Sequence, residues 1–215
     1  MNLYRHYKNK PYRFIDLVRH SETQEDLVLY ETLYDNPGGK LWVRPKDMFF
    51  ETIQHEGKSI PRFAKVECEI ETHPEFTNKL RETIKSLADK CFDVWKKEEF
   101  ETRVHRYKTF HISIAKVDSH PVGFKIGYET AEKLFYSWLG AVVPDYQRSG
   151  VASMLMQNQH DWCRGQNYQI IRTKCLNFNL PMLKLNLKSG FLVTDTELTE
   201  EGLKLVLEKR LFEKL

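Results

Sequence analysis

The pattern of hydrophobic and polar positions along the chain changes near residue 63. Before that point, short apolar runs rich in Val, Ile, Tyr and Trp alternate with turn signals, and the strongest break is Asp35-Asn36-Pro37-Gly38-Gly39. Runs of this length between Pro- and Gly-rich turns are typical of strands. They predict a small all-β domain over residues 1–63, with strands near 13–19, 27–34, 40–44 and 48–53 and a core of Tyr12, Phe14, Tyr30, Trp42 and Phe49.

After residue 63, predicted strands alternate with predicted helices. Apolar residues from 76 to 95 recur at three- and four-residue steps, which predicts a helix with one buried face. This order favours an α+β or mixed α/β domain over residues 64–215. Further helices are expected at 151–163 and 181–188, and strands at 64–71, 109–117, 121–128, 134–143, 169–176, 191–198 and 203–210.

Composition narrows the class of protein. The 215 residues carry a formal net charge of +3, with 41% hydrophobic and 29% charged residues, which is the balance of a globular protein. Basic and acidic residues are nearly equal in number, so the net charge gives no indication of nucleic-acid binding. No apolar run approaches the roughly 20 residues that span a bilayer. We therefore expect a cytoplasmic protein that binds neither membrane nor nucleic acid.

The cysteines and histidines show no metal-ligand spacing. The cysteines are scattered, without a CxxC pair or a histidine at finger-like spacing. We therefore expect buried free thiols, no disulfide framework and no bound metal. The four positions are Cys68, Cys91, Cys163 and Cys175.

The segment with the most chemical information runs from a predicted strand into a predicted helix. Its sequence is Gln147-Arg148-Ser149-Gly150-Val151-Ala152. A helix start leaves backbone N–H groups without partners, and the helix dipole adds a partial positive charge, so an anion such as a diphosphate fits there. The small residues would let phosphate oxygens approach the backbone, and Arg148 would add charge near the mouth.

This segment resembles the Q/R-x-x-G-x-G/A motif of the GNAT superfamily, the Gcn5-related N-acetyltransferases. Downstream, Asn179, Leu185 and Ser189-Gly190-Phe191 are similar to a later segment of the same family. The resemblance covers about residues 64–215. It implies the GNAT fold, a central mixed sheet in which two parallel strands, here 134–143 and 169–176, splay apart. It also implies transfer of an acetyl group from acetyl-CoA to a small-molecule or protein amine.

The resemblance further implies which residues bind acetyl-CoA. The pantetheine would pair with the backbone of the first splayed strand, and the diphosphate would rest on the amides from Arg148 to Ala152. Gln147 would lie at the entry of the loop. Asn179 would contact the cofactor arm, and a helix cap before Pro181 is the alternative role for this residue. The full expected set is Ala141, Val142, Val143, Gln147, Arg148, Ser149, Gly150, Val151, Ala152 and Asn179.

Catalysis requires that a proton be removed from the acceptor. An alkyl ammonium has a pKa of about 10.4, so a group must accept its proton before the amine can attack. The strand before the loop has no carboxylate, and Glu129 and Glu132 just upstream are the candidates for a base that acts through water. The alternative is that each is an ordinary loop carboxylate. We expect direct attack in a ternary complex, without an acyl-enzyme.

One candidate departs from the family pattern. Asn186 stands where family members often carry a tyrosine thought to protonate the leaving thiolate. An asparagine amide is no general acid, but it can hydrogen-bond the sulfur. Two alternatives to an enzyme therefore stay open. One is a non-catalytic acyl-CoA sensor, and the other is an interaction protein that does not bind the cofactor.

The first 63 residues resemble a small bacterial domain of unknown function. The resemblance is carried by Tyr4-Arg5-His6-Tyr7-Lys8, His20-Ser21-Glu22-Thr23 and Leu41-Trp42-Val43-Arg44-Pro45. We expect this domain to pack against the catalytic domain, to wall off the acceptor pocket, or to mediate self-association into a homo-oligomer. In the sensor alternative it is the recognition module.

Overall fold

The computed structural model describes residues 2–212, which form two compact units. One unit comprises the described residues up to Cys68 together with Asp145–Gly150. The other comprises Glu69–Pro144 and the described residues from Val151 onward. Among the helices of residues 2–212, none combines the length and the apolar character that crossing a membrane requires.

The amino-terminal unit is built from two antiparallel sheets, as the alternating runs predict. A five-stranded sheet has the order β4-β3-β2-β1-β7, and β5 and β6 form a separate hairpin. Its strands are β1 (Leu3–His6), β2 (Pro11–Arg19), β3 (Asp26–Thr32), β4 (Leu41–Pro45), β5 (Thr52–His55), β6 (Lys58–Pro61) and β7 (Phe63–Lys65).

Two details of this unit differ from the prediction. The run 48–53 is not one strand, because Lys46–Phe50 forms the short helix α1 before β5 begins. The helical turn buries Phe49, which stacks on Phe63 at 4.1 Å between ring centroids. Trp42 is not a core residue, since it is 38% exposed and its indole N–H donates to the carbonyl of Gly39. The buried core consists of Val28, Tyr30, Phe49 and Phe63, flanked by Tyr4, Tyr12 and Phe14.

The second unit contains a seven-stranded mixed sheet with the order β13-β14-β12-β11-β10-β9-β8. The pair β11 and β12 is parallel, and the pairs β9–β10, β10–β11, β12–β14 and β13–β14 are antiparallel. The predicted mixed α and β architecture is therefore confirmed. The strands are β8 (Cys68–His73), β9 (Phe110–Val117), β10 (His120–Ala131), β11 (Leu134–Val142), β12 (Ile170–Leu176), β13 (Leu192–Thr199) and β14 (Gly202–Arg210).

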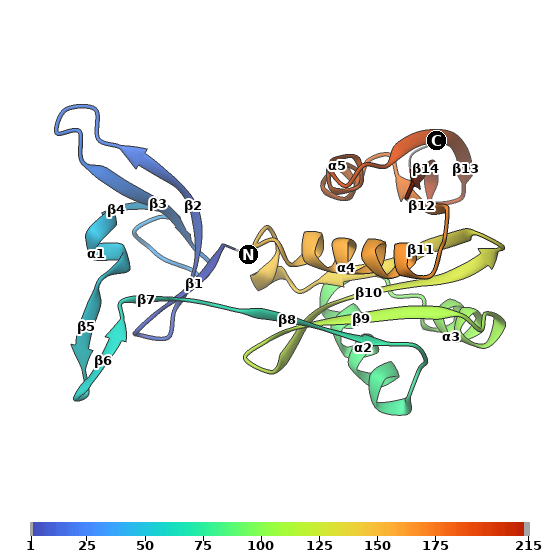
Figure 1. Cartoon of the computed structure of the whole chain (residues 1–215), viewed down its shortest axis with the longest axis horizontal. Coiled ribbons are helices and arrows are strands. Elements are labelled where there is room, and N and C mark those ends of the chain that lie inside the picture. The colour runs from blue at the N-terminus through green and yellow to red at the C-terminus, as the bar shows by residue number, and fades with distance from the viewer. Residues whose placement is uncertain (1, 213–215) are drawn as a thin grey trace. The chain divides into compact units, whose positions relative to one another are not determined.

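Helices cover both faces of this sheet. Figure 1 shows α2 (Asn78–Cys91) and α3 (Lys97–Arg106) on one side and α4 (Val151–Gly165) on the other; α5 (Leu180–Lys188) follows β12. The single helix predicted from residues 76–95 is in fact α2 alone, and α3 was not anticipated. Thr77 starts α2, because its hydroxyl accepts a hydrogen bond from the backbone N–H of Leu80 at 3.2 Å. The apolar faces of α2 and α3 pack on β9 and β10 in one core.

Candidate functional site

The two central parallel strands separate after three residues. β11 and β12 pair from Leu134 with Ile170 to Tyr136 with Arg172, and no later pair joins them in the described residues. Each strand stays paired on its outer edge, β11 with β10 and β12 with β14. The separation therefore leaves an opening in the middle of the sheet. Backbone N–H and C=O groups along such an edge need partners, and an extended ligand that carries amides can supply them.

A hydrogen bond and a β-bulge mark the point where the strands part. The buried hydroxyl of Thr173 donates to the carbonyl oxygen of Ser137 at 2.8 Å, across the beginning of the opening. Beside it, the register between β10 and β11 slips by one residue, so that Trp138 is the extra residue of a bulge. A bulge bends its strand and redirects the neighbouring side chains, which favours the divergence. The predicted residues Ala141, Val142 and Val143 lie beyond this point, at the end of β11 and just after it.

The loop after β11 has an unusual backbone. A short 3-10 turn at Pro144–Tyr146 leads to Arg148 with φ 59° and Gly150 with φ 99°, while Ser149 between them has a negative φ. A turn that contains left-handed residues can orient successive N–H groups toward one point, an arrangement that binds anions. The hydroxyl of buried Ser149 donates to the carbonyl of Tyr146 at 2.6 Å and holds the turn together.

Helix α4 begins immediately after this loop. Val151, its first residue, is fully buried and anchors the helix, and Ala152 follows in the first turn. The first backbone N–H groups of a helix have no partner within it, and the helix dipole adds partial positive charge. Gln147 is exposed, as is the side chain of Arg148, which is 74% exposed. The predicted loop residues are therefore contiguous with a helix start that can accept a phosphate group.

Asn179 takes the helix-capping role that the sequence offered as the alternative. Its side-chain oxygen accepts a hydrogen bond from the backbone N–H of Met182 at 3.2 Å, and so caps the start of α5. The capping interaction uses the side-chain oxygen, and a contact with the cofactor arm would fall to the amide nitrogen.

Asn186 is fully buried, as is Val151 among the predicted residues. It lies on α5, is 0% exposed, and neither polar atom of its side chain has a hydrogen-bond partner in the described residues. A buried amide without partners costs free energy, on the order of 1–3 kcal/mol. A hydrogen-bond partner for this amide would remove that cost.

The two carboxylate candidates lie apart from the opening. Glu129 pairs with Phe135, in the part of the sheet where β11 and β12 are still joined, and Glu132 lies in the turn after β10. The hydroxyl of Tyr168 donates to Glu129 at 2.5 Å. Burial raises the pKa of Tyr168, and the Glu129 carboxylate raises it further. Glu129 is thus part of a defined hydrogen bond, whereas Glu132 is exposed.

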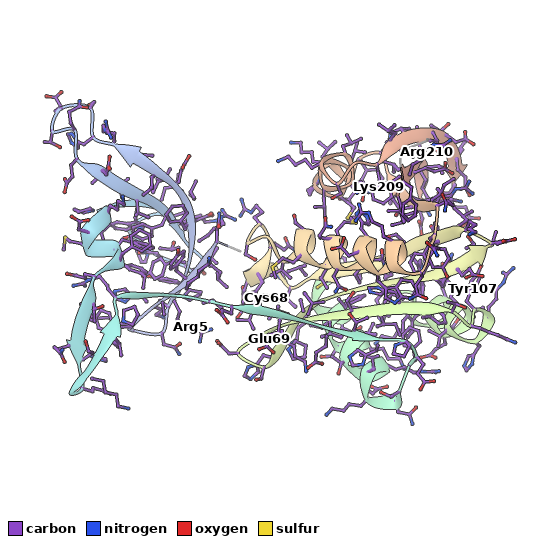
Figure 2. All side chains as sticks on the ribbon, in the orientation of Figure 1. Arg5, Cys68, Glu69, Tyr107, Lys209 and Arg210 are labelled. Atoms are coloured by element: carbon purple, nitrogen blue, oxygen red, sulfur yellow. The ribbon has the colours of Figure 1, made fainter. Side chains whose placement is uncertain are left out.

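An aromatic cluster beside the opening was not predicted from the sequence. Its members come from α3, β10, β11 and the residue after α3, and we call it the Tyr128 cluster. The guanidinium of Arg103 donates to the hydroxyl of Tyr128 at 2.5 Å and lies 5.3 Å from the ring centroid of Trp138. Tyr107, labelled in Figure 2, stacks on Tyr128 at 3.8 Å. The members are Arg103, Tyr107, Tyr128, Tyr136 and Trp138.

The cluster combines aromatic faces with acidic groups. Burial raises the pKa of Tyr136, and the negative charges of Glu197 and Glu99 raise it further, while Arg103 opposes them. Glu99 also pairs with Arg103 at 2.8 Å. Tyr136 and Trp138 lie at the point where β11 leaves β12, and both pack against the core beneath α2 and α3. The only sequence signal was the alternation of aromatic residues along β10 and β11.

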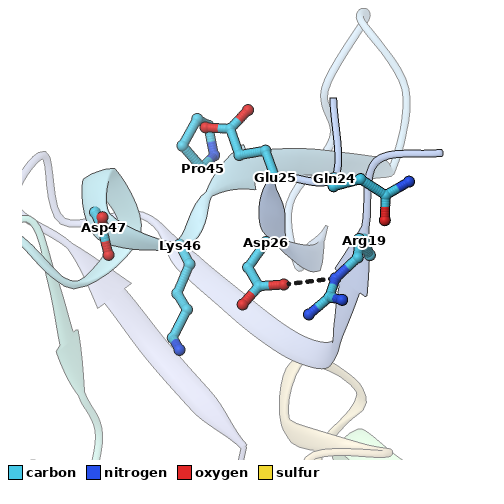
Figure 3. A pocket seen from close by; sticks show the side chains of 7 residues that line it. All are labelled: Arg19, Gln24, Glu25, Asp26, Pro45, Lys46 and Asp47. Carbon is cyan, nitrogen blue, oxygen red and sulfur yellow. Dashed lines mark hydrogen bonds and ion pairs between the residues drawn. The ribbon is translucent and has the colours of Figure 1, made fainter. Parts of the chain in front are cut away.

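A groove on the amino-terminal unit is lined by none of the residues predicted for the functional site. It has a volume of about 450 Å³, and Figure 3 shows the Arg19–Asp26 hydrogen bond of 3.2 Å within it. Both side chains of this pair are about half exposed or more, so the pair adds little to stability. The lining residues are Arg19, Gln24, Glu25, Asp26, Pro45, Lys46 and Asp47.

Two family models match the chain. Residues 80–191, slightly more than half of the chain, match the model described as Acetyltransferase (GNAT) family. Residues 2–65 match the model described as Protein of unknown function (DUF1653). Both predicted resemblances are thereby confirmed. No curated protein matches the sequence.

Several solved structures share the fold of the second unit. Ard1 from Thermoplasma volcanium is 22% identical with a TM-score of 0.59, over 68% of this chain and 99% of that one. The ribosomal-protein-S18-alanine N-acetyltransferase from Escherichia coli is 14% identical with a TM-score of 0.59, over 69% and 96%. A GNAT family acetyltransferase from Elizabethkingia anophelis, solved with acetyl-CoA bound, is 16% identical with a TM-score of 0.53, over 66% and 97%.

Proposed function

The chain belongs to the acetyltransferase (GNAT) family, and from this premise we propose that it transfers an acetyl group from acetyl-CoA to an amine by direct attack in a ternary complex. The observation that supports the proposal best is the opening between β11 and β12, which leads directly into the left-handed loop and the start of α4. An extended ligand with amides at one end and a diphosphate at the other matches both parts. Acetyl-CoA has this chemistry.

The cofactor is proposed to lie along β11. The pantetheine amides would pair with the backbone of Ala141, Val142 and Val143 at the diverging end of the strand. The diphosphate would accept hydrogen bonds from the amides of the loop and the first turn of α4. Hydrogen bonds to charged acceptors contribute about 1.5–3 kcal/mol each, so several amides would dominate the binding energy. The whole set comprises the predicted residues Gln147 to Ala152, with Asn179 on the cofactor arm.

The proposed reaction forms one bond and breaks one. The neutral amine nitrogen attacks the thioester carbon, the carbon–sulfur bond breaks, and CoA leaves as a thiolate that takes up the proton released by the nitrogen. Glu129 or Glu132 accepts the proton of the incoming ammonium through water. The amide of Asn186 donates a hydrogen bond to the departing sulfur. The N–H groups near the Trp138 bulge stabilise the negative charge on the carbonyl oxygen.

Burial of the cysteines supports direct attack over an acyl-enzyme. Cys163 is fully buried, and burial raises its pKa well above the ordinary value for a thiol. Burial also raises the pKa of Cys175. The reactive form of cysteine is the thiolate, so neither side chain is an effective nucleophile at neutral pH.

The Tyr128 cluster is proposed to receive the acceptor. It lies beside the point where β11 leaves β12, and it offers aromatic faces together with Glu99 and Glu197. A cation is attracted both to an aromatic face and to a carboxylate. An acceptor that arrives as an ammonium would compete there with Arg103, which pairs with Glu99, and with Lys174, which pairs with Glu197.

The second candidate function is an acyl-CoA sensor without turnover. Two observations favour it, the asparagine at position 186 and the absence of any carboxylate within β11. A thiol-release assay over a panel of amines distinguishes the two functions. Sustained CoA release indicates the enzyme, and binding without release indicates the sensor.

The cofactor site is tested by adding bulk and negative charge to the loop. We expect Gly150→Glu to raise the Kd for acetyl-CoA about tenfold or more, because its side chain would repel the diphosphate and φ 99° disfavours any residue with a Cβ. Gly165→Glu is the matched control, since a Cβ at the other end of α4 has open space around it. Calorimetric titration measures both. Equal affinity in Gly150→Glu and the wild type would remove the loop from the proposal.

A further inference from the structure

Helix α4 covers a polar patch on the sheet that the proposed reaction does not use. Lys125 on β10 lies directly opposite Ser113 of β9 and Gly140 of β11. Gly127 follows Lys125 by two residues on β10 and so lies on the same face of the sheet, where it is opposite Ser137 of β11. From α4, the side-chain nitrogen of Gln159 comes within 2.9 Å of the position where a Cβ on Gly127 would lie. We call Lys125, Ser113, Ser137, Gln159 and the adjacent His160 the Lys125 cluster.

The cluster is buried, and most of its polar atoms are unpaired. Lys125 is 6% exposed, and the other four members are each at most 1% exposed. In the described residues no hydrogen-bond partner is found for either hydroxyl, for the Gln159 amide or for Nε2 of His160. Natural proteins pair more than nine-tenths of such buried groups with protein or with bound solvent species. Five unpaired atoms around one lysine therefore indicate that something else binds there.

Four of the five unpaired atoms can donate a hydrogen bond, and the fifth, Oε1 of Gln159, only accepts. The ammonium of Lys209, labelled in Figure 2, lies 3.1 Å from Nδ1 of His160 and also donates to the carbonyl of Ser189 at 2.7 Å. An ammonium only donates, so Nδ1 of His160 accepts and its Nε2 carries the hydrogen. Burial, helped by Lys209, lowers the pKa of His160 to about 3, so the ring stays neutral. His160 therefore offers an N–H to the cluster.

Within residues 2–212, the charge of Lys125 has no carboxylate counter-ion. No carboxylate contributes to its electrostatic environment, and the one group that favours its charged form is Cys163. Burial raises the pKa of that thiol, so Cys163 is neutral. Burial lowers the pKa of Lys125 to about 8, which leaves it mostly protonated at neutral pH. Lysines this deeply buried are rare unless they are paired.

We propose that the Lys125 cluster binds a small monovalent anion of the size of chloride. The anion would compensate the ammonium of Lys125 and accept hydrogen bonds from the serine hydroxyls, the Gln159 amide and the His160 N–H. The site would fix α4 on the sheet independently of the proposed acetyl transfer.

Bromide is the direct probe of this site, since it replaces chloride and scatters anomalously. Crystals of the full chain grown in sodium bromide should show an anomalous peak in contact with Nζ of Lys125. If bromide peaks occur elsewhere on the protein and only water lies at Lys125, the proposal is wrong.

Thermal unfolding provides a test in solution. At constant ionic strength, replacing gluconate with bromide should raise the melting temperature of the wild type by about 3–6 °C for each tenfold excess over the Kd. Lys125→Met should lose this dependence, whatever its own stability, whereas Lys90→Met, which removes an exposed lysine on α2, should keep it. An equal response in all three proteins would contradict the proposal. If Lys125→Met does not fold, the crystallographic result decides.

Discussion

At the scale of single residues, buried histidines make the stability of the second unit sensitive to acid. Burial lowers the pKa of His160 from 6.5 to about 3, and that of His111 to about 4. Below pH 6.5 both histidines are protonated in the unfolded chain but remain neutral in the folded protein until the pH reaches their lowered pKa values. The contribution of these histidines to stability is therefore fully present above pH 6.5 and falls as the pH drops from 6.5 toward their folded-state pKa values. Carboxylates that are paired in the folded state take up protons at a lower pH than these histidines. An example is Glu201, because Lys204 and Lys96 lower its pKa to about 2.

We predict that the free energy of unfolding decreases between pH 7 and pH 5, by at most about 1.4 kcal/mol per pH unit for each buried histidine. His160→Gln should reduce this slope, and His111 should account for part of what remains. His120→Gln, at an exposed position, should leave the slope unchanged. Urea unfolding at the two pH values measures it. A slope in His160→Gln equal to that of the wild type would show that His160 protonates freely in the folded state.

A second residue-scale prediction concerns the proton acceptor. Glu129→Gln should lower turnover about tenfold near pH 7, and less at pH 9, where more of the acceptor amine is already neutral. The measurement is the pH profile of CoA release. Glu132→Gln is the comparison, because it removes the other candidate from an exposed turn. A loss confined to Glu132→Gln would transfer the role to that residue, and no loss in either variant would exclude both.

At the scale of secondary-structure elements, the place where β11 and β12 part depends on one buried hydrogen bond. Thr173→Val keeps the shape of the side chain but removes the donor to the carbonyl of Ser137. We predict a loss of about 1–2 kcal/mol in unfolding free energy, together with weaker binding of acetyl-CoA. Thr196→Val, on the exposed edge strand β13, should change stability by less than about 0.5 kcal/mol. Denaturant titration and calorimetry test both, and equal effects would show that the hydrogen bond does not hold the junction.

At the scale of the whole molecule, the two units have separate hydrophobic cores. Phe49 belongs to the core of the first unit and Phe124 to a core of the second, and both are 0% exposed. Replacing a buried phenylalanine by alanine costs about 3–5 kcal/mol. We predict two transitions in scanning calorimetry, with Phe49→Ala lowering the midpoint of one and Phe124→Ala that of the other. A single transition lowered by both variants would show that the units unfold together.

Local patterns predicted the elements of this protein well and their limits less well. The runs that became β2, β3, β9, β11 and α4 were recognised because their period and their flanking turns agree. The run 48–53 was misassigned, because three adjacent apolar residues have no clear period and the packing of Phe49 decides the conformation. Trp42 was expected in the core because strands alternate, but β4 is an edge strand where one face meets less protein.

What the sequence alone determined is the order of the elements, the glycine-containing loop at the start of α4, and the family to which these belong. These are local properties, because helix period, turn residues and the need for a left-handed glycine act over a few residues. Only the tertiary structure decided where β11 and β12 separate, which side chains lie near that point, and that Lys125 lies beneath α4 with no carboxylate partner among the described residues. Those features depend on pairing and burial between segments far apart in the chain, where the free energy comes from contacts that no local pattern encodes.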